Sequence, residues 1–88
     1  MEFKVEIAEC FKFIVEEHKV QDSDILISNE EKLSFKKSSV VFTVIHVQGT
    51  KTPYFIQWTD VDGETYTING GMKSQESVIE VIYMILDQ

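Results

Sequence analysis

The sequence predicts an α+β fold in a single domain, residues 1–88, with a helix at each end of an antiparallel β-meander. Three observations predict it. Residues 39–69 hold three runs of aromatic and β-branched residues, and Gly, Pro and Asp separate these runs. On both sides of this segment, apolar residues recur every three or four positions, as in amphipathic helices. Apolar residues make up 43% of the chain, which is enough to fill one hydrophobic core without disulfides.

The first predicted helix covers residues 2–19, where an apolar stripe follows the helical spacing. The stripe consists of Phe3, Ile7, Cys10, Phe11, Ile14 and His18. Phe13 falls on the opposite side of the helical wheel, among glutamates. We interpret it as an aromatic anchor on a surface that contacts a basic partner; a singly exposed apolar residue is the alternative. The candidate partner-binding residues are Glu2, Glu6, Glu9, Phe13, Glu16 and Glu17.

The middle of the chain predicts three to five antiparallel strands. These are residues 25–28, 32–36, 40–47, 54–59 and 64–68. The segment of residues 40–47 is apolar on both faces, with Val41 on one and Phe42 on the other. We therefore expect both helices to cover one face of the sheet and to leave the other face for a dimer partner. Trp58 and Tyr66 are expected to be cross-strand neighbours.

The second predicted helix covers residues 73–87. Ser74 is suited to cap its N-terminus, and the carboxylate of Glu76 complements the positive end of the helix dipole. The apolar stripe of this helix is wide, which predicts deep burial against the sheet. It consists of Val78, Ile79, Ile82, Ile85 and Leu86, widened by Met72, Val81 and Tyr83. Met84 falls on the polar side of the helix and is expected to lie off the core.

The charge distribution favours a basic protein partner. The formal net charge is −7, and all eight positive residues are lysines. Residues 1–31 hold nine acids against three lysines, residues 32–59 hold four lysines and no acid, and residues 60–88 hold six acids against one lysine. Because arginine is the usual bidentate reader of phosphate and guanine, its absence counts against direct nucleic-acid binding. Simple solubility is the alternative interpretation of the negative field.

The sequence carries no recognisable catalytic or metal-binding motif. Residues 60–71 begin like a calcium-binding loop, but Thr65 and Gly71 occupy the positions where an EF-hand needs Gly and Glu. A hairpin turn with an Asp-Gly pair explains the same residues. His18 and His46 have no Cys or His at metal-ligand spacing and are expected to be packing residues. We therefore expect no enzymatic activity, no cofactor and no metal.

The single cysteine and the N-terminal residues bear on localisation. Cys10 cannot form an internal disulfide, which indicates a reducing compartment. Its apolar neighbours, together with Glu6 and Glu9, are expected to raise the pKa of the thiol, which disfavours a role as nucleophile. Residues 1–6 lack the basic-then-apolar order of a signal peptide, and no run of eighteen apolar residues exists. We expect a cytoplasmic protein that does not associate with a membrane.

The order of helix, strand meander and helix is shared with the double-stranded-RNA-binding domain, and residues 71–74 at the start of the second helix resemble that family. The resemblance implies a minor alternative, a double-stranded-RNA-binding-like module. That family places a basic cluster at this helix start, whereas Gln75 and Glu76 here follow a single lysine. The surface that would meet phosphates is therefore acidic, and no binding residues are carried over from the family.

Two functional hypotheses follow from these observations. The first is a small acidic, non-enzymatic protein-binding module, an inhibitor or regulator that blocks the basic site of a nucleic-acid-handling protein. Phage anti-defence proteins, such as anti-CRISPR and anti-restriction proteins, act in this way. The alternative is a homo-oligomeric structural or accessory protein that uses the apolar sheet face. Salt-sensitive binding to a basic partner would favour the first hypothesis, and self-association the second.

Overall fold

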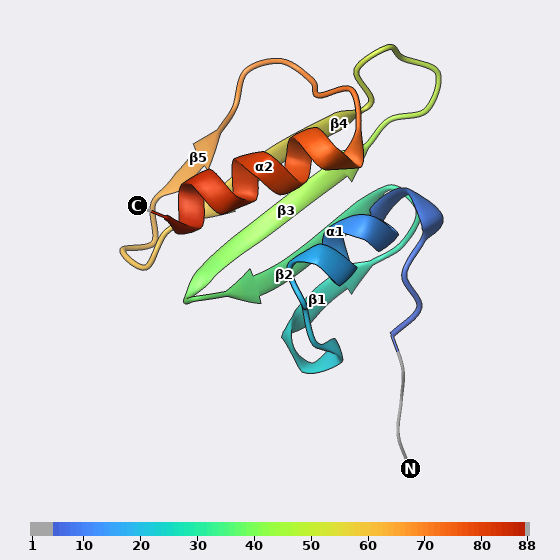
Figure 1. The fold of residues 1–88 in the computed structure, drawn as a ribbon. Helices are drawn as coiled ribbons and strands as arrows, with labels where there is room; N and C mark the ends of the chain where they lie inside the picture. The colour runs from blue at the N-terminus through green and yellow to red at the C-terminus, as the bar shows by residue number, and fades with distance from the viewer. Residues whose placement is uncertain (1–4, 88) are drawn as a thin grey trace.

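A computed structural model describes residues 5–87 and confirms the predicted α+β fold (Figure 1). A short N-terminal helical segment and a C-terminal helix accompany five antiparallel strands in one open sheet. In chain order the elements are η1 (Glu9–Phe11), α1 (Lys12–Glu17), η2 (Asp22–Asp24), β1 (Ile25–Ser28), β2 (Lys32–Lys37), β3 (Val40–His46), β4 (Tyr54–Thr59), β5 (Thr65–Thr67) and α2 (Gln75–Leu86).

The strands form a meander in which each strand pairs with its neighbours in the sequence, in the order β1-β2-β3-β4-β5. β3 is therefore the central strand, as its apolar residues on both faces predict. The turn after β4 is closed by a hydrogen bond of 2.9 Å from the Gly63 amide to the Asp60 carbonyl, and Gly63 has φ of +84°. Trp58 lies directly opposite Tyr66, with ring centroids 5.7 Å apart, which confirms the predicted cross-strand pair.

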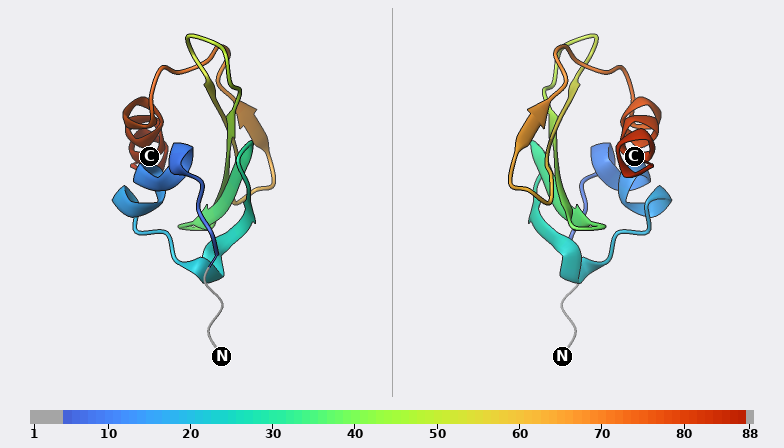
Figure 2. Two further views of the ribbon diagram at one scale, coloured as in Figure 1. Left: turned by 90° about the vertical axis from the view of Figure 1, so that its right-hand side faces the viewer. Right: turned by 90° about the vertical axis from the view of Figure 1, so that its left-hand side faces the viewer.

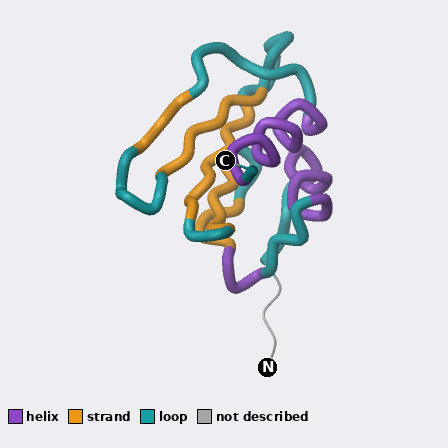
Figure 3. The backbone as a smooth tube through the Cα atoms, turned by 60° about the vertical axis from the view of Figure 1, so that its left-hand side comes forward, coloured by secondary structure: helices purple, strands orange, loops and turns teal. Residues whose placement is uncertain are grey.

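Both helices lie on the same face of the sheet, as predicted (Figure 2). They lie side by side, and the sheet forms the second layer (Figure 3). The core between the layers consists of Phe11, Ile14, Leu33, Phe35, Phe42, Val44, Tyr54, Ile56, Val78 and Ile82. The rings of Phe35 and Phe42 stack at its centre with centroids 5.4 Å apart. The residues that alternate with these along the strands face away from the helices.

Residues 5–8 and 18–19 are not helical, which corrects the helix predicted over residues 2–19; residues 2–4 lie outside the described part of the chain. Among the described residues, helical structure begins with a 3-10 turn at Glu9, while Ala8 is extended with ψ of 149°. No side chain caps this helix start from within its own segment. The segment before Ala8 is held instead by a hydrogen bond from the Ser28 hydroxyl to the Glu6 carbonyl. Tertiary contacts thus override the helical pattern of residues 5–8, because most of the stability of a helix in a protein comes from packing and not from its own sequence pattern.

The second helix agrees more closely with the prediction. It begins at Gln75, and the Ser74 hydroxyl accepts a hydrogen bond of 3.4 Å from the Ser77 amide, which confirms Ser74 as the N-cap. Val78 and Ile82 are fully buried, and Met84 is exposed, as expected. Within residues 5–87, no helix has the length and apolar character that crossing a membrane requires.

Candidate protein-binding surface

A groove between α1 and α2 gathers aromatic and acidic side chains on the outer surface of the helical layer. We call it the interhelical groove; its lining residues are Phe13, Glu16, Glu17, Glu76, Ile79, Glu80 and Tyr83. Four of the seven are carboxylates, and none is a lysine. Phe13 is 62% exposed and Tyr83 is 46% exposed, although both are large apolar rings. The groove therefore combines an apolar surface with a strongly negative rim.

The structure divides the residues that the sequence nominated as partner-binding. Phe13, Glu16 and Glu17 lie together at the interhelical groove, and the predicted exposure of Phe13 is confirmed. Glu6 and Glu9 line a different recess, because residues 5–8 are not helical and therefore do not continue the face of α1. Glu2 lies outside the described residues.

The other half of the groove comes from α2, which the sequence reasoning missed. Glu76 and Glu80 lie one turn apart on the exposed side of α2, with Ile79 and Tyr83 beside them. The signal was present as two glutamates at i and i+4 with a tyrosine three residues further on. It could not be interpreted from the sequence, because nothing local indicates that this side of α2 lies against α1.

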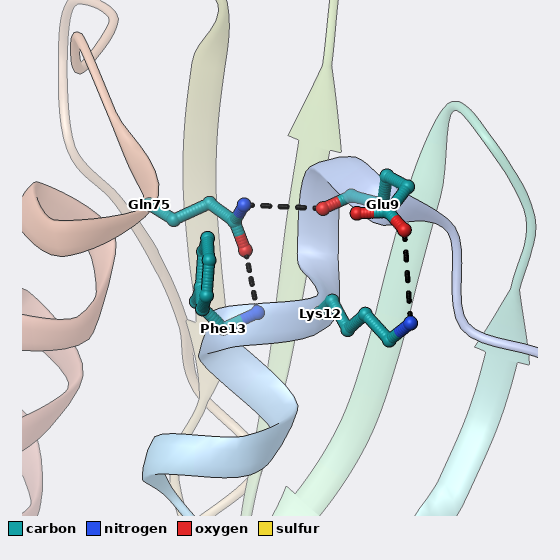
Figure 4. A network of polar contacts seen from close by, with 4 residues as sticks. All are labelled: Glu9, Lys12, Phe13 and Gln75. Carbon is teal, nitrogen blue, oxygen red and sulfur yellow. Dashed lines mark hydrogen bonds and ion pairs between the residues drawn. The ribbon is translucent and has the colours of Figure 1, made fainter.

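Gln75 joins the two helices where both begin (Figure 4). Its Oε1 atom accepts hydrogen bonds from the amides of Phe13, at 2.9 Å, and Ile14, at 3.4 Å. Its Nε2 atom donates to the Glu9 carbonyl at 3.1 Å. The first amides of a helix have no partners within the helix, and Phe11 at the N-cap of α1 provides none. A side chain of α2 therefore caps α1, and this fixes the position of Phe13 beside α2.

An ion pair lies near this cap but contributes little. Lys12 Nζ is 3.6 Å from Glu9 Oε1, and both side chains are mostly exposed (Figure 4). Solvent screening leaves such a pair with about 0–1 kcal/mol. Because Glu9 is engaged with Lys12 and lies outside the groove, it adds little to the negative rim.

His18 closes the other end of the helix pair beneath Tyr83. Its ring is only 2% exposed and lies 4.4 Å from the Tyr83 ring, centroid to centroid. Nε2 is 3.2 Å from the Ile79 carbonyl, so it carries the proton and donates, while Nδ1 has no partner among the described residues. The Tyr83 hydroxyl donates to the Glu17 carboxylate at 3.2 Å. His18 is thus a packing residue, as expected, and it supports one wall of the groove.

The pKa of His18 is lowered from its ordinary value of 6.5, chiefly because burial disfavours the charged imidazolium. The Ile79 carbonyl opposes this shift. Lys37, whose ammonium donates to the His18 carbonyl, lowers the pKa further, while Glu17 raises it. A proton added to Nδ1 would find no acceptor there, so protonation acts against the packing of α1 on α2.

Lowering the pH from about 7.5 to about 5.5 is expected to reduce the free energy of unfolding through His18. Between the lowered folded pKa and the unfolded pKa of 6.5, the unfolded chain binds a proton that the buried imidazole does not. The stabilisation is therefore complete above the unfolded pKa and is lost as the pH falls toward the folded pKa, by at most about 1.4 kcal/mol per pH unit. Urea unfolding at several pH values measures it. His18→Gln should remove this part of the pH dependence; equal slopes for both proteins would contradict the assignment.

Outside the groove, the remaining potential nucleophile or metal ligand of note is the thiol of Cys10, which is half-buried. Burial and the carboxylate of Glu30 raise the pKa of the Cys10 thiol, although its backbone hydrogen bonding acts in the opposite direction. The direction agrees with the sequence-based expectation, but the charge responsible is Glu30 rather than Glu6 or Glu9. Within residues 5–87, no group of three or more His, Cys, Asp or Glu side chains is placed to hold a metal ion.

Comparison of the chain with protein-family models, with curated proteins and with solved structures gives no match. The function is therefore inferred from the residues and geometry of the interhelical groove.

Proposed function

We propose that this chain is a non-enzymatic protein-binding module whose interhelical groove accepts a basic segment of a partner protein. The observation that carries the proposal is Phe13, an aromatic ring 62% exposed between carboxylates of two helices, with no lysine in the lining. Exposed aromatic rings are the common anchors of protein interfaces. The surrounding carboxylates favour a partner segment with positive charge.

Lysine and arginine side chains match this groove in two ways. Their cationic ends are attracted to the faces of aromatic rings such as Phe13 and Tyr83, and their charges complement the surrounding carboxylates. Each exposed ion pair contributes little alone, but four carboxylates act on the same segment. Their summed field also accelerates association, and added salt reduces this effect. Binding through the groove should therefore be strongly salt-dependent.

The partner we propose is a nucleic-acid-handling protein in the cytoplasm, blocked at its basic site. Surfaces that bind nucleic acid present several lysines and arginines to phosphates. An acidic protein with a net charge of −7 carries the same sign as the nucleic acid and can compete for such a surface. This is the mode of action of inhibitors of the phage anti-defence type, such as anti-CRISPR and anti-restriction proteins.

Reversing two groove charges should weaken the binding of a basic probe. We define the groove variant as Glu16→Lys with Glu80→Lys; both side chains are exposed and line the groove from opposite helices. The matched control is Asp24→Lys with Asp62→Lys, which makes the same change in net charge at exposed positions outside the groove. Fluorescence anisotropy with a labelled oligo-arginine peptide measures the affinity. The groove variant is expected to lose at least about tenfold, or about 1.4 kcal/mol, and the control much less.

Two further measurements distinguish binding at the groove from an attraction that depends only on the net charge of the protein. Raising the salt concentration from about 50 mM to about 200 mM should weaken the binding of the wild-type protein. Equal losses in the groove variant and the control would show that only net charge matters, and would contradict the proposal. Once the probe result stands, wild-type and groove-variant baits in a nuclease-treated lysate identify the natural partner by mass spectrometry.

A further inference from the structure

The face of the sheet turned away from the helices is charged in the opposite sense to the groove. The strand register places Lys32 opposite Ile45 and Lys36 opposite Val41 on this face, and Phe55 lies beside Ile45. Among the residues that the register assigns to this face, only the two lysines are charged. We call it the open sheet face. In a chain of net charge −7, it is a surface without carboxylates.

The composition of the open sheet face also favours contact with another protein surface. Val41, Ile45 and Phe55 are only half-buried, because no helix covers them (Figure 2). Hydroxyl groups of neighbouring strands on this face satisfy one another in pairs: Ser34 lies 3.2 Å from Thr43, and Thr59 lies 3.0 Å from Thr65, oxygen to oxygen. Paired hydroxyls reduce the cost of removing this surface from water. The result is an apolar strip with two lysines along one side of it, on β2.

We propose that copies of this chain associate head to tail, with the interhelical groove of one copy seated on the open sheet face of the next. The chemistry of the two surfaces is complementary. Phe13 projects from the middle of one, and Val41, Ile45 and Phe55 receive it on the other. Lys32 and Lys36 stand about 13 Å apart along β2, from the rise of a strand, and both border the apolar strip on its β2 side. The groove carboxylates stand on either side of Phe13, on two helices about 8–10 Å apart.

The position of the two surfaces determines the kind of assembly. They lie on opposite sides of the molecule, because the groove is formed by the helices and the other surface is the far side of the sheet (Figure 2). Such a contact cannot close as a two-fold dimer and instead produces chains or rings. At about 0.15 M salt the Debye length is about 8 Å, so the net charges of two copies are screened while the contacting charges still attract.

The proposal rests on the proposed function in one respect, the use of the same groove. A basic partner and a second copy must therefore compete for it. An excess of the oligo-arginine peptide is expected to disperse the assembly into single copies. The assembly would thus store the protein with its groove covered until a basic partner appears.

A charge-exchange experiment tests the head-to-tail contact. The face variant is Lys32→Glu with Lys36→Glu, and the groove variant is the one defined above. Sedimentation velocity from micromolar to millimolar concentration should show self-association of the wild-type protein. Each variant alone should remain monomeric, and an equimolar mixture should associate again, because each retains one intact surface and the altered surfaces complement each other. Circular dichroism confirms that both variants are folded.

Four outcomes would overturn the proposal: a monomeric wild-type protein at millimolar concentration, a groove variant that still self-associates, a face variant that still self-associates, or a mixture that does not recover association. The second would indicate contact between two open sheet faces instead. The face variant keeps its groove intact, so its binding to the oligo-arginine peptide tests the proposed function separately. Loss of self-association with retained peptide binding supports both proposals; a face variant that self-associates normally refutes only the head-to-tail contact.

Discussion

Replacing Phe11 by alanine is expected to reduce the free energy of unfolding by about 3–5 kcal/mol. Phe11 is fully buried, and it packs edge-on against His46 and Tyr54 with ring centroids 6.3 Å and 6.5 Å away. The Tyr54 hydroxyl also donates to the Cys10 carbonyl at 2.8 Å, so this cluster attaches the N-terminal segment to the sheet. Because small domains are stabilised by only about 5–15 kcal/mol, the variant should lie close to unfolding.

The same substitution two residues further on provides the matched control. Phe13→Ala removes an identical side chain that is 62% exposed, so its stability should change by no more than about 0.5 kcal/mol. Urea unfolding of both variants measures the difference. Similar losses for the two variants would mean that Phe13 is part of the core and would remove it from the proposed binding surface.

Replacing Gln75 by alanine is expected to reduce the free energy of unfolding by about 2 kcal/mol, more than the same replacement of an ordinary exposed glutamine. The change removes two hydrogen bonds to the first amides of α1 and one to the Glu9 carbonyl. α1 comprises only six residues and its own N-cap position supplies no side-chain acceptor, so it has no substitute for this cap. We therefore expect α1 to loosen from α2 together with Phe13.

Two control variants separate capping from general effects of substitution. Gln75→Glu keeps an acceptor for the amides of α1, and its charge suits a helix N-terminus, but it cannot donate to the Glu9 carbonyl. The free energy of unfolding should therefore fall by about half as much as in Gln75→Ala. Gln57→Ala, at an exposed position of β4, should stay within about 0.5 kcal/mol of the wild-type protein. If Gln75→Ala were as mild as Gln57→Ala in thermal and urea unfolding, the capping role would be wrong.

The sheet and its faces could be predicted from the sequence because their signals are local. Alternating apolar residues around Phe42 and Val44, and turn residues such as Gly63, specify strands and their connections within a few positions. The cap at Ser74 is equally local, since it depends on an amide three residues away. These elements agree with the prediction to within one or two residues.

The start of α1 and the second wall of the groove could not be predicted, because both depend on contacts between distant segments. The helical pattern continues before Glu9, yet residues 5–8 are not helical, and the Ser28 hydroxyl donates a hydrogen bond to the Glu6 carbonyl there. Gln75 caps Phe13 from sixty-two positions away. Glu16 and the α2 glutamates likewise line one groove only because the two helices lie side by side.

The exposed phenylalanine is the point at which sequence and structure agree most usefully. Phe13 departs from the apolar stripe in the sequence, and it projects from the helical layer in the structure. The glutamates that surround it are not the full set that a continuous helix predicts. Glu16 and Glu17 remain from that set, and α2 supplies the other two carboxylates of the rim.

The most direct test of a binding site between the helices is backbone-amide NMR of isotope-labelled protein, titrated with unlabelled oligo-arginine peptide at a protein concentration at which sedimentation shows single copies. We expect the largest changes in chemical shift at the interhelical groove, at the amides of Phe13, Ile79, Glu80 and Tyr83. Amides of the open sheet face, such as those of Thr43 and Gln57, should change little. Changes confined to that face, or spread evenly over all acidic positions, would contradict a binding site between the two helices.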